Sequence, residues 1–401
     1  MFAKQILLPA LAAWSVSAAN ICSETTITLN SAADAAALAS CSTIAGSIVL
    51  SSTVSGVVSI DGPQQIKGDI VCEDAGQLTS LGSSSIGTIG GTFRLTNLTL
   101  LSTLSMSDLT SVKALEWTAL PALSQLTFPS VLSKANAVLI TNTFLSTLDG
   151  INLQTVGTLN INNNNRLKTF STQVANITQL VDISSNGQNL DVSFPNLIWA
   201  ANATFRNVSS IKLPSLATVN GSLGFYGTNS ESIIAPNLTT VGDITKSASV
   251  GGSLALVANS ALSNISFPVL KSVAGAVQVA NNTALSAISF PALETVNGAI
   301  DFAGNFSTPE LPEIKDVKGG FNVQSTVKID CSNFESMKNK IIQGTFTCKT
   351  TADAKSGVGS STGTSSSDSP TSSKKSDAGS FGVSEAVAGF SVLGGLLQML
   401  L

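Results

Sequence analysis

Residues 265–305 read "ISFPVLKSVAGAVQVANNTALSAISFPALETVNGAIDFAGN" and contain one motif written twice. Phe267 recurs as Phe290, and Val279 recurs at the same offset as Phe302. The segments VQV and IDF occupy equivalent places, and each alternates hydrophobic, polar and hydrophobic residues, which is the spacing of a β-strand with one buried face. A fixed period of about 20 to 50 residues indicates a solenoid, in which each structural unit stacks on the one before it.

The alternating pair can be followed through most of the chain, in steps of about 20 to 23 residues. One step is longer, because "VGDITKSASVGGS" is inserted between Phe225 and Leu256. Such short strands are stable only when neighbours close each other's hydrogen bonds and bury a shared interior. We therefore predict an all-β, right-handed parallel β-helix or leucine-rich-repeat-like solenoid of about 13 turns over residues 20–350. The predicted inward pairs are Ile48/Leu50, Ile70/Cys72, Phe93/Leu95, Leu115/Trp117, Val138/Ile140, Leu159/Ile161, Val181/Ile183, Ala203/Phe205, Leu223/Phe225, Leu254/Leu256, Val277/Val279, Ile300/Phe302 and Phe321/Val323.

An asparagine follows many of these strands. We expect it to turn the chain and to bond backbone groups inside the coil, as a structural ladder and not as a catalytic feature. The glycines that precede the strands allow positive φ or a close approach between turns. The predicted ladder residues are Asn142, Asn163, Asn259, Asn282 and Asn305.

The composition excludes several classes of function. Charged residues make up 11% of the chain and the net charge is −4, so there is no electrostatic case for a nucleic-acid partner. The chain has no histidine, which removes the commonest general base and the commonest metal ligand. No phosphate-binding loop, metal-ligand cluster or nucleophile constellation is recognisable, and we predict no cofactor and no metal site.

The N-terminus has the pattern of a secretory signal peptide. Lys4 supplies the positive charge, residues 6–16 are apolar, and small residues lead up to Ala19. We therefore predict a signal peptide at residues 1–19 and a secreted protein in which disulfides can form.

Five cysteines remain, so one is left over within a monomer. Cys22 and Cys41 lie at the first predicted turn, and Cys331 and Cys348 follow the last. Pairing within each end would protect the open edges of the terminal strands, although other pairings are compatible with the sequence. Cys72 occupies an inward strand position and is expected to be a buried, unreactive thiol.

Nine Asn-x-Ser/Thr sequons predict heavy N-glycosylation of a secreted chain, although an Asn- and Ser-rich sequence also creates sequons by chance. Two of them, Asn281 and Asn305, lie close to the expected ladder, which suggests side chains that point partly inward. The sequon asparagines are Asn97, Asn176, Asn202, Asn207, Asn220, Asn237, Asn264, Asn281 and Asn305.

The composition changes after Cys348. Residues 351–378 are rich in Ser and Thr, have no apolar periodicity and predict an extended stalk. Residues 379–401 end in an apolar tail and predict a removable signal for a glycosylphosphatidylinositol (GPI) anchor, attached at Ala378, with Asp377 and Ser376 as close competitors. The rival interpretation, a transmembrane helix, is less favoured because the tail would span about 24 Å of a hydrocarbon core of about 30 Å.

Parallel β-helices include polysaccharide-cleaving enzymes, which need carboxylates close together as acid and base. The residues between the inward pairs form an outward column in which no two acids are neighbours: Asp182 and Asp301 are several turns apart. Arg94 and Glu116 are neighbours and are expected to form a surface ion pair. We therefore predict no enzymatic activity. The outward column is Val49, Val71, Arg94, Glu116, Leu139, Asn160, Asp182, Thr204, Gly224, Ala255, Gln278, Asp301 and Asn322.

Carbohydrate-binding sites usually present aromatic faces. Trp117 belongs to an inward position, which leaves Trp199 and Tyr226 as candidates. A binding role is therefore conceivable, but the sequence does not define a site.

The chain resembles the fungal GPI-anchored cell-wall organisation proteins, relatives of the sporulation-specific wall proteins built on receptor-L-domain-like repeats. The stretches that carry the resemblance are "CSTIAGSIVLSSTVSG" (41–56), "LTNLTLLSTLSM" (95–106), "LDGINLQTVGTLNINNNNRLKTF" (148–170) and the repeats at 265–305. The stalk and the anchor signal fit as well.

The resemblance implies a non-catalytic surface glycoprotein that supports fungal cell-wall organisation and integrity. Its partners would be the plasma membrane, through the GPI lipid, and cell-wall glucan. Its location would be the outer leaflet of the plasma membrane, the cell wall, or both. The alternative is a receptor-like or adhesive module that binds a glycan or protein ligand on one face of the solenoid.

Overall fold

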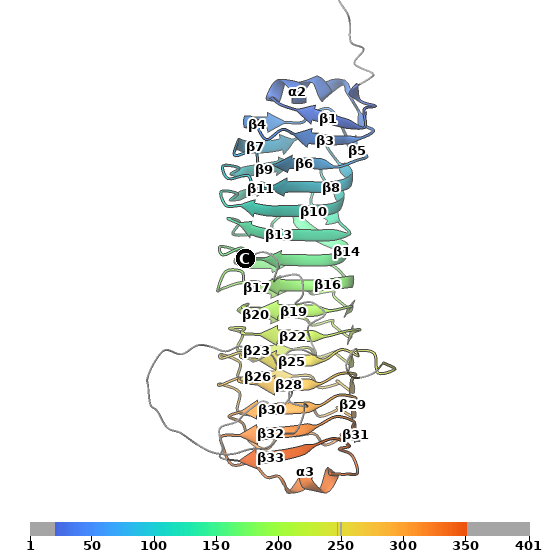
Figure 1. Ribbon diagram of the computed structural model, residues 1–401, viewed down its shortest axis with the longest axis vertical. Helices are drawn as coiled ribbons and strands as arrows, with labels where there is room; N and C mark the ends of the chain where they lie inside the picture. The colour runs from blue at the N-terminus through green and yellow to red at the C-terminus, as the bar shows by residue number, and fades with distance from the viewer. Residues whose placement is uncertain (1–20, 247, 249–250, 351–401) are drawn as a thin grey trace, which may run out of the picture. The chain divides into compact units, whose positions relative to one another are not determined.

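The computed structural model describes residues 21–246, 248 and 251–350. These residues form two compact units with the boundary between Leu132 and Ser133. Each unit is a parallel β-solenoid in which successive turns contribute one main strand, and Figure 1 shows these main strands side by side. The predicted signal peptide, stalk and anchor signal lie outside the described residues.

The first unit has five main strands in the described residues, and every pairing between them is parallel. A second, parallel sheet lies on another side of the coil, and short strands continue the main sheet around a corner. The main strands are β1 (Thr26–Leu29), β3 (Ser47–Leu50), β6 (Ile70–Glu73), β8 (Thr88–Thr96) and β10 (Ser111–Leu120). The second sheet comprises β4 (Ser55–Ser59), β7 (Gln77–Ser83), β9 (Thr103–Met106) and β11 (Gln125–Thr127), and the short strands are β2 (Thr43–Ile44) and β5 (Gln65–Ile66).

The second unit repeats this plan with ten main strands, which in the described residues are β13 (Ala137–Thr143), β14 (Ile151–Asn162), β16 (Asn176–Ser184), β19 (Ala203–Arg206), β22 (Leu223–Tyr226), β25 (Leu254–Val257), β28 (Val277–Ala280), β30 (Ile300–Gly304), β32 (Phe321–Ser325) and β33 (Phe346–Thr350). The other strands are β15 (Thr169–Ser171), β17 (Asp191–Ser193), β18 (Trp199–Ala200), β20 (Ser210–Lys212), β21 (Thr218–Val219), β23 (Ser232–Ile234), β24 (Thr240–Val241), β26 (Asn264–Ser266), β27 (Ser272–Val273), β29 (Thr295–Val296) and β31 (Asp316–Val317). Strand β12 (Leu132–Lys134) lies at the unit boundary.

The all-β solenoid predicted from the repeat is confirmed, with about 15 turns instead of about 13. The two additional turns are the terminal ones, formed by β1 and β33. Both pair in register with the neighbouring main strand, Ile27 with Ile48 and Val323 with Cys348. Short helices follow β1 and precede β33: α2 (Ala32–Ala36) with the 3₁₀ turn η1 (Ala37–Ser40), and α3 (Ser332–Met337).

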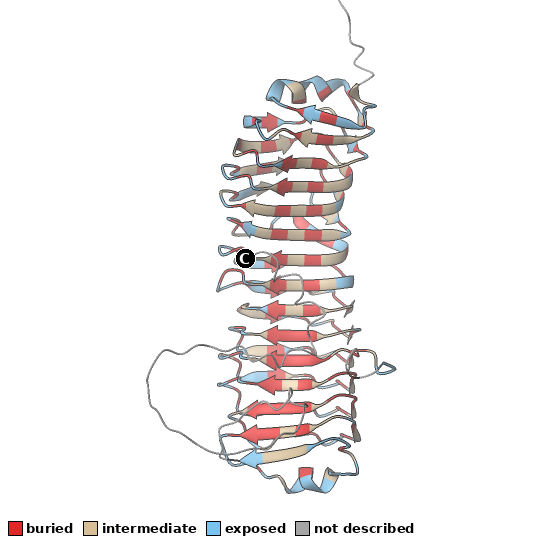
Figure 2. Cartoon of the chain, viewed as in Figure 1, coloured by how far each residue is buried: buried red, intermediate tan, exposed pale blue. Residues whose placement is uncertain are grey.

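The predicted inward pairs form the core. Their side chains are buried in every turn, and Figure 2 shows the alternation of buried and partly exposed residues along β8 and β10. Equivalent aromatic residues stack between turns: the rings of Phe267 and Phe290 lie 5.9 Å apart at an interplanar angle of 17°. Cys72 is fully buried in β6, as expected from its inward position.

A left-handed corner follows the main strand in most turns. Asn97, Asn142, Asn163, Asn207 and Asn281 have φ between 54° and 58°. Asparagine adopts this region more readily than other residues with a Cβ atom, because its short polar side chain can bond locally. Of the five predicted asparagines, Asn142 and Asn163 therefore turn the chain in this way, whereas Asn259, Asn282 and Asn305 do not have positive φ.

The buried ladder lies one residue further along than predicted in several turns. Asn259 and Asn282 are buried, as expected, but Asn142, Asn163 and Asn305 are exposed. The expectation for these three residues was wrong. At Asn142 and Asn163 the left-handed corner directs the side chain outward and the next residue enters the coil, whereas after Asn305 the buried residue is Phe306. The buried positions are Thr143, Asn164, Asn186, Thr228, Asn259 and Asn282.

Glycines before the main strands of the second unit allow close approach between turns. A Cβ atom on Gly298 would lie 2.5 Å from the carbonyl carbon of Gly275, and one on Gly319 would lie 2.6 Å from that of Gly298. The backbone N–H of Gly298 donates to the Gly275 carbonyl oxygen at 2.9 Å. Any side chain in this column would push successive turns apart.

Each disulfide joins two cysteines near the same end of the described chain. Cys22 is bonded to Cys41 with a Cα–Cα distance of 5.6 Å, and Cys331 to Cys348 with a Cα–Cα distance of 6.0 Å. The first bond closes the segment that contains β1 and α2. The second connects the start of α3 to β33.

Candidate functional site

The outward face of each unit consists of the side chains that point away from the coil interior on the main strands. The strand register places the predicted outward column in line within each unit. Along this column no acidic residue is paired with another in the described strands. In the described strands the column therefore lacks the pair of neighbouring carboxylates that glycoside hydrolysis requires.

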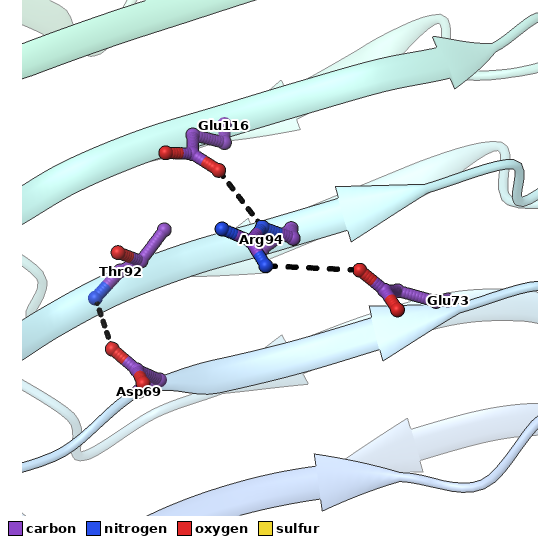
Figure 3. A network of polar contacts seen from close by, with 5 residues as sticks. All are labelled: Asp69, Glu73, Thr92, Arg94 and Glu116. Atoms are coloured by element: carbon purple, nitrogen blue, oxygen red, sulfur yellow. Dashed lines mark hydrogen bonds and ion pairs between the residues drawn. The ribbon is translucent and has the colours of Figure 1, made fainter.

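Arg94 in the first unit lies between two glutamates (Figure 3). Its Nε donates to Oε2 of Glu116 at 2.8 Å, and its Nη1 lies 3.9 Å from Oε1 of Glu73. The ion pair expected between Arg94 and Glu116 is thus confirmed. The hydrogen bond and charge of Glu116 raise the pKa of Arg94. Below this pair, Oδ1 of Asp69 accepts from the backbone N–H of Thr92 at 2.6 Å.

The arrangement around Arg94 joins three adjacent strands, β6, β8 and β10. Its cation neutralises the carboxylates on either side, so neither glutamate is placed as a proton donor opposite a free base. Half-exposed ion pairs of this kind contribute little free energy and respond to salt. We interpret the network as a structural feature of the outward face.

A different cluster lies on the outward face of the second unit. We call Asp182, Arg206, Gly224 and Tyr226 the β16–β22 cluster. The Arg206 guanidinium carbon lies 4.2 Å from the centroid of the Tyr226 ring, which is a cation–π contact between paired residues of β19 and β22. The Tyr226 ring lies across Gly224, where an added Cβ atom would be 2.3 Å from Cε2. Glycine at this position therefore allows the ring to lie flat on the sheet.

Asp182 is the acidic member of the cluster. Burial raises the pKa of its carboxyl group, while a hydrogen bond with Ser184 and the positive charge of Arg206 lower it by less. Its Oδ1 atom is buried and has no hydrogen-bond partner in the described part of the chain. A buried acceptor without a donor is costly, so a ligand that donates a hydrogen bond to this oxygen would remove that cost.

Sequence reasoning singled out Asp182 and Tyr226 separately and did not connect them with Arg206. The signal that could have connected them is a second row of outward side chains. Each member of this second outward row lies two residues after a member of the outward column. Arg206 and Tyr226 are adjacent members of that row. The other aromatic candidate, Trp199, begins β18 and pairs with Asn176 and Thr218. It is therefore not part of this cluster.

Asp301 differs from the expectation for an outward residue. It is fully buried, and its carboxylate accepts from Nε2 of Gln278 at 3.0 Å and from Nδ2 of Asn322 at 2.6 Å. Alternation fixed the direction of the side chain correctly. It did not reveal that amide side chains on both neighbouring strands would close over the carboxylate.

The nine sequons remain candidates for glycosylation. Asn281 and Asn305, expected to point partly inward, are both exposed. Asn202 and Asn207 are half-buried: Oδ1 of Asn202 accepts from the backbone N–H of Ser222 at 3.0 Å, and Nδ2 of Asn207 donates to the Asn186 carbonyl oxygen at 3.3 Å. The exposed sequon asparagines are Asn97, Asn176, Asn220, Asn237, Asn264, Asn281 and Asn305.

Two shallow hollows lie away from the outward face. One of about 390 Å³ lies beside the inserted loop and includes Asn220 and Asp243. Another of about 370 Å³ is lined by Arg166 and Lys168, and the Arg166 guanidinium stacks on the exposed ring of Phe144 at 4.2 Å. Neither contains a carboxylate pair.

Neither a metal site nor a membrane-spanning helix is found in the described residues. Among them, no three metal-ligating side chains come together as a potential metal site. The same residues include no helix with the length and apolar character needed to cross a membrane. The candidate anchor residues Ser376, Asp377 and Ala378 lie outside the described residues.

Comparison with known proteins identifies the family. Over 368 residues, 42% are identical to a protein named ecm33 from Aspergillus fumigatus, covering 89% of this chain and 90% of the relative. The chain belongs to the Ecm33 family. Members of this family include a cell wall protein ecm33 of Schizosaccharomyces pombe, 35% identical over 84% of this chain and 79% of the relative. A cell surface GPI-anchored protein of Candida albicans is 32% identical over 86% and 84%.

Three of the relatives are named as cell-wall or GPI-anchored cell-surface proteins, and none of these three names denotes an enzyme. Sporulation-specific protein 2 of Saccharomyces cerevisiae is also similar, with 30% identity over 76% of this chain and 60% of the relative. No family model matches the chain. No solved structure matches it either.

Proposed function

We propose that the chain is a cell-surface glycoprotein that supports fungal cell-wall organisation and integrity without catalysing a reaction. Membership of the Ecm33 family carries this proposal. The regular solenoid is consistent with it, because stacked similar turns create an extended repetitive surface without specialised loops.

The proposed absence of catalysis follows from the outward face. Its acidic residues are either joined to a cation, as Glu116 is to Arg94, or separated from other acids, as Asp182 is. A hydrolase of polysaccharides would need two carboxylates at a spacing that leaves room for the glycosidic bond. Incubation of the purified protein with cell-wall polysaccharides should therefore produce no new reducing ends.

The proposed anchorage uses a signal peptide at residues 1–19, a stalk at 351–378 and a GPI signal at 379–401. Attachment at Ala378 would leave two small residues after it, whereas Asp377 and Ser376 compete closely. A phospholipase specific for phosphatidylinositol should release the protein from intact cells. Recovery of mature surface protein that still ends at Leu401 would contradict the anchor.

The function is tested by deleting the gene of a family member in a fungus and expressing this chain in its place. Restored growth on wall-stressing dyes, together with normal wall thickness, is the expected result. A variant without residues 379–401 should be secreted to the medium and should fail to restore growth. Full rescue by that secreted form would show that surface attachment is not required.

A second candidate function is a receptor-like or adhesive module. The observation that favours it is the β16–β22 cluster, since Arg206, Tyr226 and Asp182 serve no evident structural purpose together. Under this alternative the solenoid would bind a glycan or protein on one face.

A further inference from the structure

We propose that the outward face of β14 to β22 binds a neutral, polyhydroxylated glycan chain through Asp182, Arg206 and Tyr226. The inference deepens the proposed function, and it rests on that function only for the presence of such glycans at the cell wall.

The first argument is the character of this face. The strands β14, β16, β19 and β22 are paired in continuous parallel register, so their outward side chains form straight rows. The side chains around the cluster are short and polar, with Asn160, Asn162, Ser184 and Thr204 in the two rows. Amides and hydroxyls can both donate to and accept from sugar hydroxyl groups.

The second argument is charge. Within these rows Asp182 is balanced by Arg206, whose positive charge acts on the Asp182 carboxyl group. The face therefore offers no excess cation to an anionic polymer. It offers hydrogen-bonding groups and one aromatic ring, which is the chemistry that suits a neutral sugar.

The third argument is the unsatisfied oxygen. Oδ1 of Asp182 has no donor among the described residues, although it is buried. Arg206 is exposed and rests on the Tyr226 ring. A sugar ring that stacks on Tyr226 would take the place of this long, flexible side chain. The displaced guanidinium, or a sugar hydroxyl group, would then supply the missing donor to Asp182.

The fourth argument is the distribution of sequons. None of the nine sequon asparagines belongs to the outward column or to the second outward row. Asn202 directly precedes β19 and Asn207 directly follows it, and both are half-buried. The exposed sequon asparagines all lie outside these two rows, so glycans attached to them would leave the rows accessible.

Tyr226 is the only tyrosine in the chain, which makes the test specific. Full-length protein produced with 3-fluorotyrosine and purified in detergent should give one ¹⁹F resonance, from Tyr226. It would be titrated with a six-unit β-1,3-glucan oligosaccharide, a six-unit β-1,4-linked N-acetylglucosamine oligosaccharide and, as an anionic contrast, an oligogalacturonate of equal length. We expect a saturable shift with at least one neutral oligosaccharide and none with the anionic one.

Variants locate the site by calorimetric titration with the oligosaccharide that binds. Tyr226→Ala and Asp182→Asn should each weaken binding by about tenfold or more, the equivalent of roughly 1.4 kcal/mol. The matched control is Phe144→Ala, which removes an exposed ring that carries an arginine at the same 4.2 Å distance but lies outside the outward rows. Thermal unfolding of every variant checks that the fold is retained.

The absence of a ¹⁹F shift with both neutral oligosaccharides, or a preference for the oligogalacturonate, would overturn the proposal. Binding that survives Tyr226→Ala, or an equal loss of affinity in Phe144→Ala, would also overturn it. These results leave the cell-wall function intact, because release by phospholipase and rescue of wall growth are measured separately. Conversely, loss of rescue with normal binding would contradict the proposed function alone.

Discussion

The side-chain oxygen of Asn282 accepts two hydrogen bonds from Asn259 one turn earlier, from its backbone N–H at 2.9 Å and from its Nδ2 at 3.0 Å. Nδ2 of Asn282 donates in turn to the carbonyl oxygen of Leu256 at 2.9 Å. The two asparagines thus satisfy backbone groups that the corner of the coil would otherwise bury without partners.

Replacing Asn282 by Ala should destabilise the second unit. The change removes the acceptor of the Asn259 backbone N–H and a donor to the Leu256 carbonyl, while Nδ2 of Asn259 keeps its bond to the Phe225 carbonyl oxygen; each group left unsatisfied costs roughly 1–3 kcal/mol. Asn165→Ala, at an exposed position, is the control and should change the free energy of unfolding by less than about 0.5 kcal/mol. Equal effects in denaturant titrations would contradict the ladder.

The core prediction concerns Phe302 and its neighbour Asp301. Phe302 is fully buried, and Phe302→Ala should cost about 3–5 kcal/mol because it leaves a cavity. Asp301→Ala should cost about 1–3 kcal/mol, since Gln278 and Asn322 lose their acceptor. The exposed Asp149→Ala provides the baseline. A value for Asp301→Ala as small as that baseline would mean that its two hydrogen bonds add nothing.

The sequence predicted the stacking of the turns better than the environment of individual residues. The period and the alternation of VQV and IDF decide which side of a strand faces the interior, and Val279 and Phe302 are paired as the repeat predicts. They do not decide which asparagine of the run at 162–165 enters the coil. That depends on the left-handed corner at Asn163, which moves the buried position to Asn164.

Long-range relationships explain the other differences. The burial of Asp301 depends on amides in the turns before and after it, at distances of 20 or more residues in the chain. The terminal strands β1 and β33 carry the same alternation, with Ile27/Leu29 and Phe346/Cys348, but each pairs with a main strand on one side only in the described residues. The β16–β22 cluster combines members of two outward rows, of which only the first was predicted from the repeat.

The thiol of Cys72 should be inert in the native protein. Burial raises its pKa to about 12, so almost no thiolate exists near neutral pH. A thiol reagent at pH 8 should label the folded protein at the rate of global unfolding. Fast labelling without denaturant would contradict the inward position of the side chain.

The same pKa shift predicts a pH dependence of stability. The thiol has a pKa near 9.0 in the unfolded state and near 12 in the folded state, so the unfolded state is favoured increasingly between these values. The free energy of unfolding should therefore fall more steeply over that interval in the wild type than in Cys72→Val. Comparison of the two proteins removes the contribution of lysines and Tyr226.

The Arg94–Glu116 ion pair should contribute less than about 1 kcal/mol. Both side chains are about one-third to two-fifths exposed, and water and salt screen such pairs. Glu116→Gln keeps the shape and removes the charge. The difference in unfolding free energy between wild type and variant should shrink further at high salt, and a large, salt-independent loss would mean that the pair is effectively buried.

The two disulfides are expected to stabilise the ends of the chain locally. Cys331 and Cys348 are 17 residues apart, and closing a loop of about 15 residues stabilises a protein by about 3 kcal/mol in the chain-entropy account. Replacing both residues by Ala should lower the melting temperature and speed amide exchange in β33, whose only main-strand neighbour in the described residues is β32. The double replacement of Cys22 and Cys41 should act in the same way on β1. Exchange that rises equally in β14 and β16, far along the chain from either bond, would show that the disulfides stabilise the whole solenoid and not its ends.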